Sequence, residues 1–321
     1  MAVQSHSRNI QFLDLVISRK TQHARFPSLA ELVPLWDEHS KSNSSLPKEF
    51  EKGTVTALIK EVSLDLTSET VTLLIEFSDM DAPDPTFRDH KKKATRHIGK
   101  TAGEGNSYSA HLIISTKRQK LPNTYICVLE MVPSISSSRV QVILNDAIRS
   151  VCNATKDGRF QFTKPGVSKK ALSFVPYVQL HGHPSDQFNR DIEHGTISSL
   201  HLFEPQSSQP LAQAAYLKAE QSLIKVKVSK SIPIGKRIST IVSELVPNRK
   251  THPVTRIFIQ PEREGRSFHV DIETETGRLI SEAYTKFKRI SPISPPISSA
   301  SPDQIVTHFE TLMKTELVNA R

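Results

Sequence analysis

The stretch Thr54–Phe77, TVTALIKEVSLDLTSETVTLLIEF, decides the fold class of this chain. Val, Ile, Leu and Thr fill its two halves, and the polar residues 67–69 separate them, which is the pattern of a β-hairpin. Acidic residues alternate with apolar ones along both halves. We therefore expect an antiparallel sheet with one solvent-exposed face. The acids expected on that face are Glu61, Asp65, Glu69 and Glu76.

Further strands and helices surround this hairpin in the first half of the chain. Residues 9–19 form a strongly apolar run, which indicates a strand buried on both faces. Ser28 and Glu31 form a capping box, so a short helix is expected from there to about His39. The other elements expected in this half are strands over residues 111–115 and 125–132 and an amphipathic helix over residues 138–152.

The second half of the chain opens with residues 165–213, where many Pro and Gly residues predict a turn-rich region. A Pro- and Ser-rich linker near its end precedes an amphipathic helix, for which Ser301 is the expected N-cap, with Pro302 in the first turn and Gln304 closing the box. That helix needs an apolar surface to cover, on this chain or on a second copy. The other expected elements are strands over residues 173–181, 196–203, 223–228, 254–260, 267–273 and 278–284, and a helix over residues 234–245.

These patterns predict an α+β fold with two domains, each a mainly antiparallel sheet with a few packed helices. The length of 321 residues agrees with a prior of about two domains. The expected domains are residues 1–164 and 214–321, with the turn-rich residues 165–213 between them.

Composition limits the class of protein. The formal charge is +9 and the pI is near 9.5, which favours attraction to nucleic acid or anionic lipid. The two cysteines, Cys127 and Cys152, lie in apolar patterns and are expected to be free, buried thiols in a reducing compartment. The N-terminal residues lack the apolar segment of a signal peptide, and no run approaches the roughly 20 apolar residues of a membrane span. We therefore expect a cytoplasmic protein.

The most charged stretch is Arg88–Lys120, which holds nine Lys or Arg residues and two acids, a net charge of +7. It follows an acidic block, residues 31–84, with a net charge of −8. A loop that mixes cationic side chains with glycine suits contact with phosphates, although a solvated surface loop is the alternative. The candidate nucleic-acid-binding residues of this stretch are Arg88, Lys91, Lys92, Lys93, Arg96 and Lys100.

A second basic group lies in the predicted second domain. Its candidate residues are Lys225, Lys227, Lys230, Lys236 and Arg237, on a predicted strand and at the start of the helix that follows it. Charges at intervals without a base-reading helix are typical of contact with the duplex backbone. Few aromatic residues stand near either basic group in the sequence, which weighs against stacking of a single strand. Double-stranded DNA without sequence preference is therefore the favoured ligand.

Signs of catalysis or metal binding are weak by comparison. His181, His183, His194 and His201 cluster in the sequence, but without a cysteine or an HExxH pattern, so we expect turn and surface histidines. Residues 269–275 place one His and three acids on one side of a strand, from which a metal-dependent nuclease using Asp271 and Glu273 is an alternative. We expect no enzyme, no metal and no cofactor.

Four segments carry a resemblance to a known family. They are PYVQLHGHP (residues 176–184), SLIKVKVSKSIPIGKRISTIVSEL (222–245), RIFIQPEREGRSFHVDIETETGRLISEAY (256–284) and QIVTHFETLMKTEL (304–317). Their order resembles RexA, the cytoplasmic member of the temperate-phage Rex exclusion pair, over about half the chain. The DNA-binding component of Kiwa-type defence is similar in layout. The resemblance carries residues over only from Lys225 to Arg237.

The resemblance implies a dimeric, non-sequence-specific DNA binder of phage exclusion or anti-phage defence that signals to a separate membrane protein. The leading hypothesis is therefore a homodimer that binds double-stranded DNA, with a separate membrane-protein partner. Two alternatives stay open: the nuclease named above, and a basic scaffold that docks an acidic protein or a membrane surface.

Overall fold

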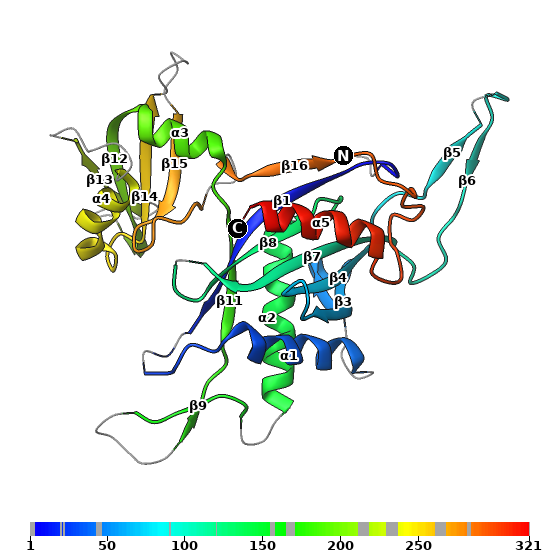
Figure 1. The fold of residues 1–321 in the computed structure, drawn as a ribbon, viewed down its shortest axis with the longest axis horizontal. Helices are drawn as coiled ribbons and strands as arrows, with labels where there is room; N and C mark the ends of the chain where they lie inside the picture. Colours follow the sequence, from blue (N-terminus) through cyan, green and yellow to red (C-terminus); the bar gives the residue numbers. More distant parts are fainter. Residues whose placement is uncertain are drawn as a thin grey trace. The chain divides into compact units, whose positions relative to one another are not determined.

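The computed structural model describes residues 4–320 except residues 20, 22, 43–46, 90, 120, 155–157, 165–170, 211–217, 229–236, 261–267 and 281–283. The chain forms two compact units (Figure 1). The first unit comprises Met1–Leu180 together with Lys288–Arg321, and the second comprises His181–Phe287. Antiparallel sheets with packed helices build both, so the predicted α+β fold class is confirmed.

This division differs from the expected boundaries at residues 164 and 213. Strand β11 (Tyr177–Gly182), from the turn-rich region, joins the sheet of the first unit, and the C-terminal residues return to that unit. The sequence pattern marks the turns of this region but carries no sign of which sheet a strand joins.

One eight-stranded sheet organises the first unit, in the order β11-β1-β8-β7-β4-β3-β2, with β16 also paired to β1. The predicted hairpin is present as β3 and β4, paired from Val55↔Asp79 to Asp65↔Thr70. Besides β11, the strands of this sheet are β1 (Arg8–Ser18), β2 (Lys48–Phe50), β3 (Val55–Asp65), β4 (Thr70–Asp79), β7 (Asn106–Arg118), β8 (Thr124–Glu130) and β16 (Phe287–Ile290). Short elements of the unit outside it are η1 (Glu51–Gly53), β9 (Gln161–Phe162) and β10 (Leu172–Ser173).

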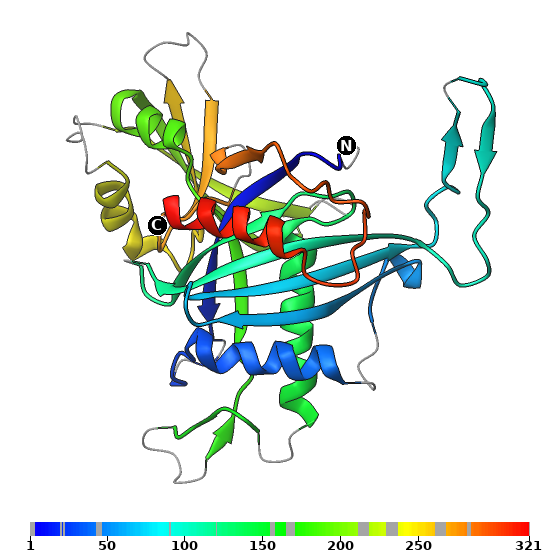
Figure 2. The same cartoon turned by 45° about the vertical axis from the view of Figure 1, so that its right-hand side comes forward.

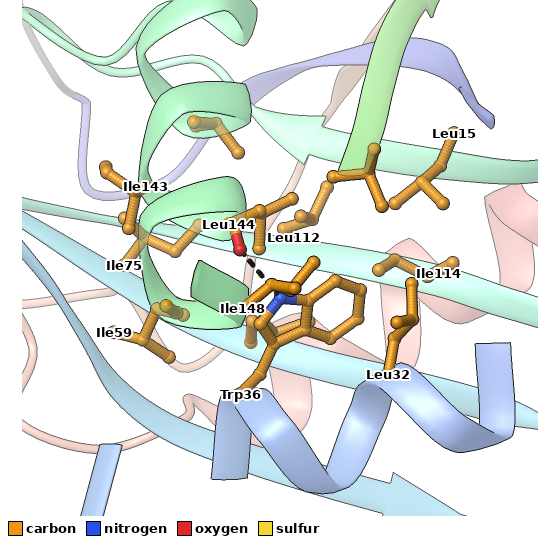
Figure 3. Packing of buried hydrophobic residues seen from close by; sticks show 14 of the residues in the cluster. Leu15, Leu32, Trp36, Ile59, Ile75, Leu112, Ile114, Ile143, Leu144 and Ile148 are labelled. Carbon is orange, nitrogen blue, oxygen red and sulfur yellow. Dashed lines mark hydrogen bonds between the residues drawn. The ribbon is translucent and has the colours of Figure 1, made fainter. Parts of the chain in front are cut away.

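Helices α1 (Leu29–Lys41) and α2 (Ser137–Ala154) cover one face of this sheet (Figure 2). The capping box holds as expected, because the Ser28 backbone N–H donates to a Glu31 carboxylate oxygen at 2.8 Å. Trp36 is fully buried between the helices, and its indole N–H donates to the Leu144 carbonyl at 3.2 Å (Figure 3). A buried indole that finds a polar partner contributes its whole apolar surface to the core.

Helix α5 (Thr307–Asn319) covers the opposite face of the sheet, where Phe309, Met313 and Leu317 are fully buried. Burying such side chains stabilises by roughly 1.5–3 kcal/mol each. The apolar surface that this helix needs therefore lies on its own chain. Strand β1 is buried on both faces, as expected, because α5 covers one side of it and the α1–α2 layer covers the other.

The predicted start of α5 is wrong. The helix begins at Thr307, with Val306 as the N-cap residue, six residues after Ser301. The Ser301 hydroxyl is used elsewhere, because it lies 2.8 Å from the Ser109 hydroxyl and 3.2 Å from the Glu76 carboxylate. A cap signal in the sequence does not show that a tertiary partner competes for the same hydroxyl.

The acids of the hairpin also differ from expectation, because α5 and the residues before it cover much of their face. Asp65 lies 2.9 Å from the Lys314 ammonium, and Glu76 lies 3.2 Å from that of Lys60. A Glu61 oxygen accepts the Ile305 backbone N–H at 2.7 Å. Of the four, Glu69 keeps an exposed position. These carboxylates thus form a polar layer that holds the C-terminal segment to the sheet.

The second unit is a four-stranded sheet in the order β13-β12-β14-β15, with antiparallel neighbours throughout. Its described helices, α3 and α4, pack on the same face over Leu200, Ile257 and Val270. The prediction of a strand over residues 278–284 is wrong for the described residues of that range, since Leu279 makes only isolated bridges. The elements are α3 (Asp186–His194), β12 (Thr196–Pro210), β13 (Lys218–Val226), α4 (Arg237–Leu245), η2 (Val246–Asn248), β14 (Val254–Gln260) and β15 (Phe268–Glu273).

Candidate nucleic-acid interface

A two-stranded ribbon leaves the first unit between β4 and β7. Its strands are β5 (Thr86–Arg88) and β6 (Thr95–His97), paired through Phe87↔Arg96. We call residues 80–105 the arm, which projects away from the large sheet (Figures 1 and 2). Each described residue in 83–99 is exposed. The expected basic loop is therefore a ribbon, and its later part, from Asn106 onward, is the core strand β7 instead.

The tip of the arm displays its lysines in a defined turn. The Asp89 carboxylate accepts the backbone N–H groups of Lys91 at 2.9 Å and Lys92 at 3.0 Å. Across the ribbon, the Arg96 guanidinium lies 5.6 Å from the centre of the Phe87 ring. The acid at the tip thus organises the turn, and residues 86–98 carry a net charge of +4. The cationic side chains exposed on the arm are Arg88, Lys91, Lys92, Lys93 and Arg96.

The base of the arm is braced by the side chain of Lys100, which the sequence predicted to contact a ligand. The Lys100 ammonium donates to the Met80 carbonyl at 2.8 Å and to that of Ala82. At Gly105 an added Cβ would lie 2.5 Å from the Ser78 hydroxyl, so only glycine fits beside β4. Lys100 and Gly105 therefore fix where the ribbon leaves the sheet, and we place the display of charge beyond them.

Two residues of the second predicted basic group are exposed, and one makes contacts within its own unit. Lys225, on edge strand β13, and Lys227, just beyond it, are exposed. The Arg237 guanidinium donates to the carbonyls of Ile192, at 3.1 Å, and of Gly195, which ties α4 to the end of α3. The remaining two residues of the group, Lys230 and Lys236, lie outside the described residues.

The second unit also brings together aromatic side chains that the sequence reasoning missed. Alternation sends Leu200 and Leu202 toward the helices, so His201 and Phe203 point to the other side of the sheet, which we call the open face. Strand pairing then places Arg256 beside His201 and Phe258 beside His269. The period-two pattern was readable in each strand. The register that joins the strands was not, because paired residues lie up to 64 residues apart in the chain.

Ring contacts cross three strands of the open face. The His201 and Phe258 ring centroids are 4.4 Å apart, and those of Phe258 and His269 are 5.6 Å apart. The Arg256 guanidinium lies 4.8 Å from the Phe203 ring centre. Burial, followed by the charges of Lys225 and Arg256, lowers the pKa of His201. The shift favours the uncharged form of the His201 ring.

The carboxylates proposed for a nuclease are engaged in other contacts. Asp271 accepts two hydrogen bonds from the Arg256 guanidinium, at 2.7 and 2.9 Å, and this contact raises the pKa of Arg256. Glu273 accepts the Thr276 hydroxyl and lies 3.7 Å from Arg278. Among the described residues, no group of three or more His, Cys, Asp or Glu is placed to hold a metal ion.

Two further expectations concern the cysteines and the membrane. Cys127 and Cys152 are free and buried, and burial raises the pKa of both thiols. Within the described part of the chain, no helix has both the length and the apolar character needed to cross a membrane.

Comparison with protein-family models, with curated proteins and with solved structures gives no match. The arm and the open face are the two candidate binding surfaces among the described residues.

Proposed function

We propose that this protein binds double-stranded DNA without sequence preference and that the arm is its main contact. The observation that carries the proposal is the projecting ribbon with five exposed cationic side chains, Arg88, Lys91, Lys92, Lys93 and Arg96. A two-stranded ribbon fits the major groove of B-DNA, which is about 12 Å wide. Lysine and arginine along such a ribbon neutralise phosphates and release counterions, which supplies affinity without base reading.

The biological setting that we propose comes from the resemblance to the Rex exclusion pair. In it the protein acts in the cytoplasm in phage exclusion or anti-phage defence, as a homodimer, and passes its signal to a separate membrane protein. Light scattering on the purified chain tests the dimer. A mass near twice 35.9 kDa supports it, and a mass near that of one chain contradicts it.

Fluorescence anisotropy with a labelled duplex, over a series of salt concentrations, tests the DNA proposal. The variant is Lys91→Gln/Lys92→Gln/Lys93→Gln, which removes three charges and keeps side-chain length. We expect weaker duplex binding and a log–log salt slope smaller by about 3, since each phosphate contact contributes about 0.9.

Two controls make this result specific. Arginine at the same three positions keeps the charge and should keep the binding. Lys41→Gln/Lys117→Gln removes two exposed lysines of the same unit that pair with Asp37 and Glu69, and should leave the salt slope unchanged. Equal loss in the arm variant and in this control contradicts a dedicated arm.

A further inference from the structure

We propose that the open face of the second unit binds single-stranded nucleic acid, whose bases stack on Phe258 and its flanking histidines. The inference deepens the proposed function, on which it rests for the class of polymer, but it uses different residues and a different form of the ligand. Duplex binding by the arm and strand binding by the open face can therefore fail separately.

Three aromatic rings, those of His201, Phe258 and His269, form a line on the open face. His201, Phe258 and His269 stand on β12, β14 and β15, so the line crosses the sheet directly from His269 to its pairing partner Phe258 and then diagonally to His201, which pairs with Arg256. Neighbouring strands lie about 4.8 Å apart, which keeps the rings at stacking distances. His269 is exposed, and Phe258 and His201 are half-buried, so ring surface remains accessible to a ligand.

A line of aromatic rings can recognise unpaired bases by stacking. Every base has a flat π-face, and stacking on an aromatic side chain contributes about 1–3 kcal/mol per base without sequence preference. A four-stranded sheet with helices behind it and aromatic rings on its front is one of the general arrangements that bind unpaired strands. Bases in a duplex are already stacked on each other, so this face cannot use them.

Charge is distributed unevenly across the open face. One row of paired residues reads Lys225, His201, Arg256 and Asp271, from β13 at one end of the sheet to β15 at the other. Lys225 is exposed and Lys227 follows it, whereas Asp271 already neutralises Arg256. Phosphates are therefore attracted to the β13 side, whereas the Arg256–Asp271 ion pair toward β15 has no net charge to attract them. The backbone of a bound strand should follow the edge at β13, with its bases directed over the rings.

The charge pattern also favours nucleic acid over a protein occupant. A face that packs on protein would gain from an apolar surface, yet this one carries Arg256, Asp271 and two histidines. Burial and the charges of Lys225 and Arg256 lower the pKa of His201, which favours its uncharged form. It can then stack as a neutral ring beside a cationic edge.

Anisotropy with labelled oligo-dT, oligo-U and a duplex of the same length tests this on the full chain. Phe258→Ala should weaken single-strand binding by about 5- to 150-fold, the equivalent of one lost stack. Phe258→Tyr should retain it, and duplex binding should change little in either variant. Phe87→Ala, on an exposed ring of the arm, is the matched control and should leave single-strand binding unchanged. The two oligomers show whether RNA or DNA is preferred.

A second variant guards against misfolding of the first. His269 is exposed, so His269→Ala removes one end of the ring line at little cost to packing. It should also weaken single-strand binding, with an unchanged circular dichroism spectrum. Wild-type single-strand affinity in both alanine variants overturns the proposal. So does a dimer that these variants dissociate while single-strand affinity stays constant, because the face would then belong to a second copy.

Discussion

The arm and the open face combine the same kinds of side chain in opposite proportions. The arm presents five cations and one aromatic ring on a ribbon that contributes nothing to the described cores. The open face presents a line of rings on a sheet whose other side is a core, with the exposed lysines Lys225 and Lys227 at one edge. The difference teaches that charge alone does not identify a ligand. Geometry decides whether phosphates or bases are offered a partner.

Salt dependence should separate the two surfaces most strongly. Five phosphate contacts by the arm give a log–log slope of about −4.5, and two contacts by Lys225 and Lys227 to a single strand give about −1.4. Raising salt from about 50 to 200 mM should then weaken duplex binding by roughly 500-fold and single-strand binding by roughly 7-fold. Parallel anisotropy titrations measure both. Equal slopes contradict the division of labour.

Removal of the arm should have the next largest effect. Replacing residues 86–98 by a short Gly-Ser linker should weaken duplex binding by roughly 100-fold or more, because counterion release supplies most of non-specific affinity. The melting temperature should stay nearly constant, since no described core residue lies in the arm. Calorimetry and anisotropy on the same preparation provide both readings. An arm that is needed for folding would break the comparison.

A smaller, positive effect should follow from releasing Arg256. Asp271→Asn removes the carboxylate that neutralises this guanidinium. We expect single-strand affinity to rise about 3- to 5-fold, the equivalent of an exposed ion pair worth up to about 1 kcal/mol. Glu275→Gln, which breaks the contact with Arg249 outside β15, is the control and should have no effect. A loss of affinity in Asp271→Asn contradicts the proposed path of the backbone.

The smallest effect should concern neither surface. Contacts with Arg25 and Ser28 lower the pKa of Glu31 to about 2. Because the folded value lies below the ordinary one, the stabilisation is present above about pH 4.5 and is lost as the pH falls toward 2. Glu31→Ala should cost about 0.5–1 kcal/mol near pH 7, and the difference should vanish in acid. Urea titrations near pH 7 and in acid check this, with Glu38→Ala as the control. DNA binding should be unchanged in both variants.

The sequence was informative where local pattern and tertiary structure agree. The β3–β4 hairpin, the box at Ser28 and the stripe of α2 follow from periodicity and capping, and all are present. Charge located the arm, although the turn organised by Asp89 and the anchoring of Lys100 depend on contacts within the ribbon.

What the sequence did not reveal depends on pairing between distant segments. The Ser301 cap failed because that hydroxyl contacts Ser109, nearly 200 residues away. The ring line was missed because His201, Phe258 and His269 look isolated until the strands are in register. The inference from sequence that few aromatics lie near the second basic group was therefore wrong for the open face.

The central claim is that two separate surfaces bind duplex and single strand. Anisotropy at about 100 mM salt, with duplex and oligo-dT against Lys91→Gln/Lys92→Gln/Lys93→Gln and against Phe258→Ala, tests it most directly. We expect the arm variant to lose mainly duplex binding and Phe258→Ala to lose only single-strand binding. If both variants weaken both ligands by the same factor, or neither variant weakens either ligand, the claim is contradicted.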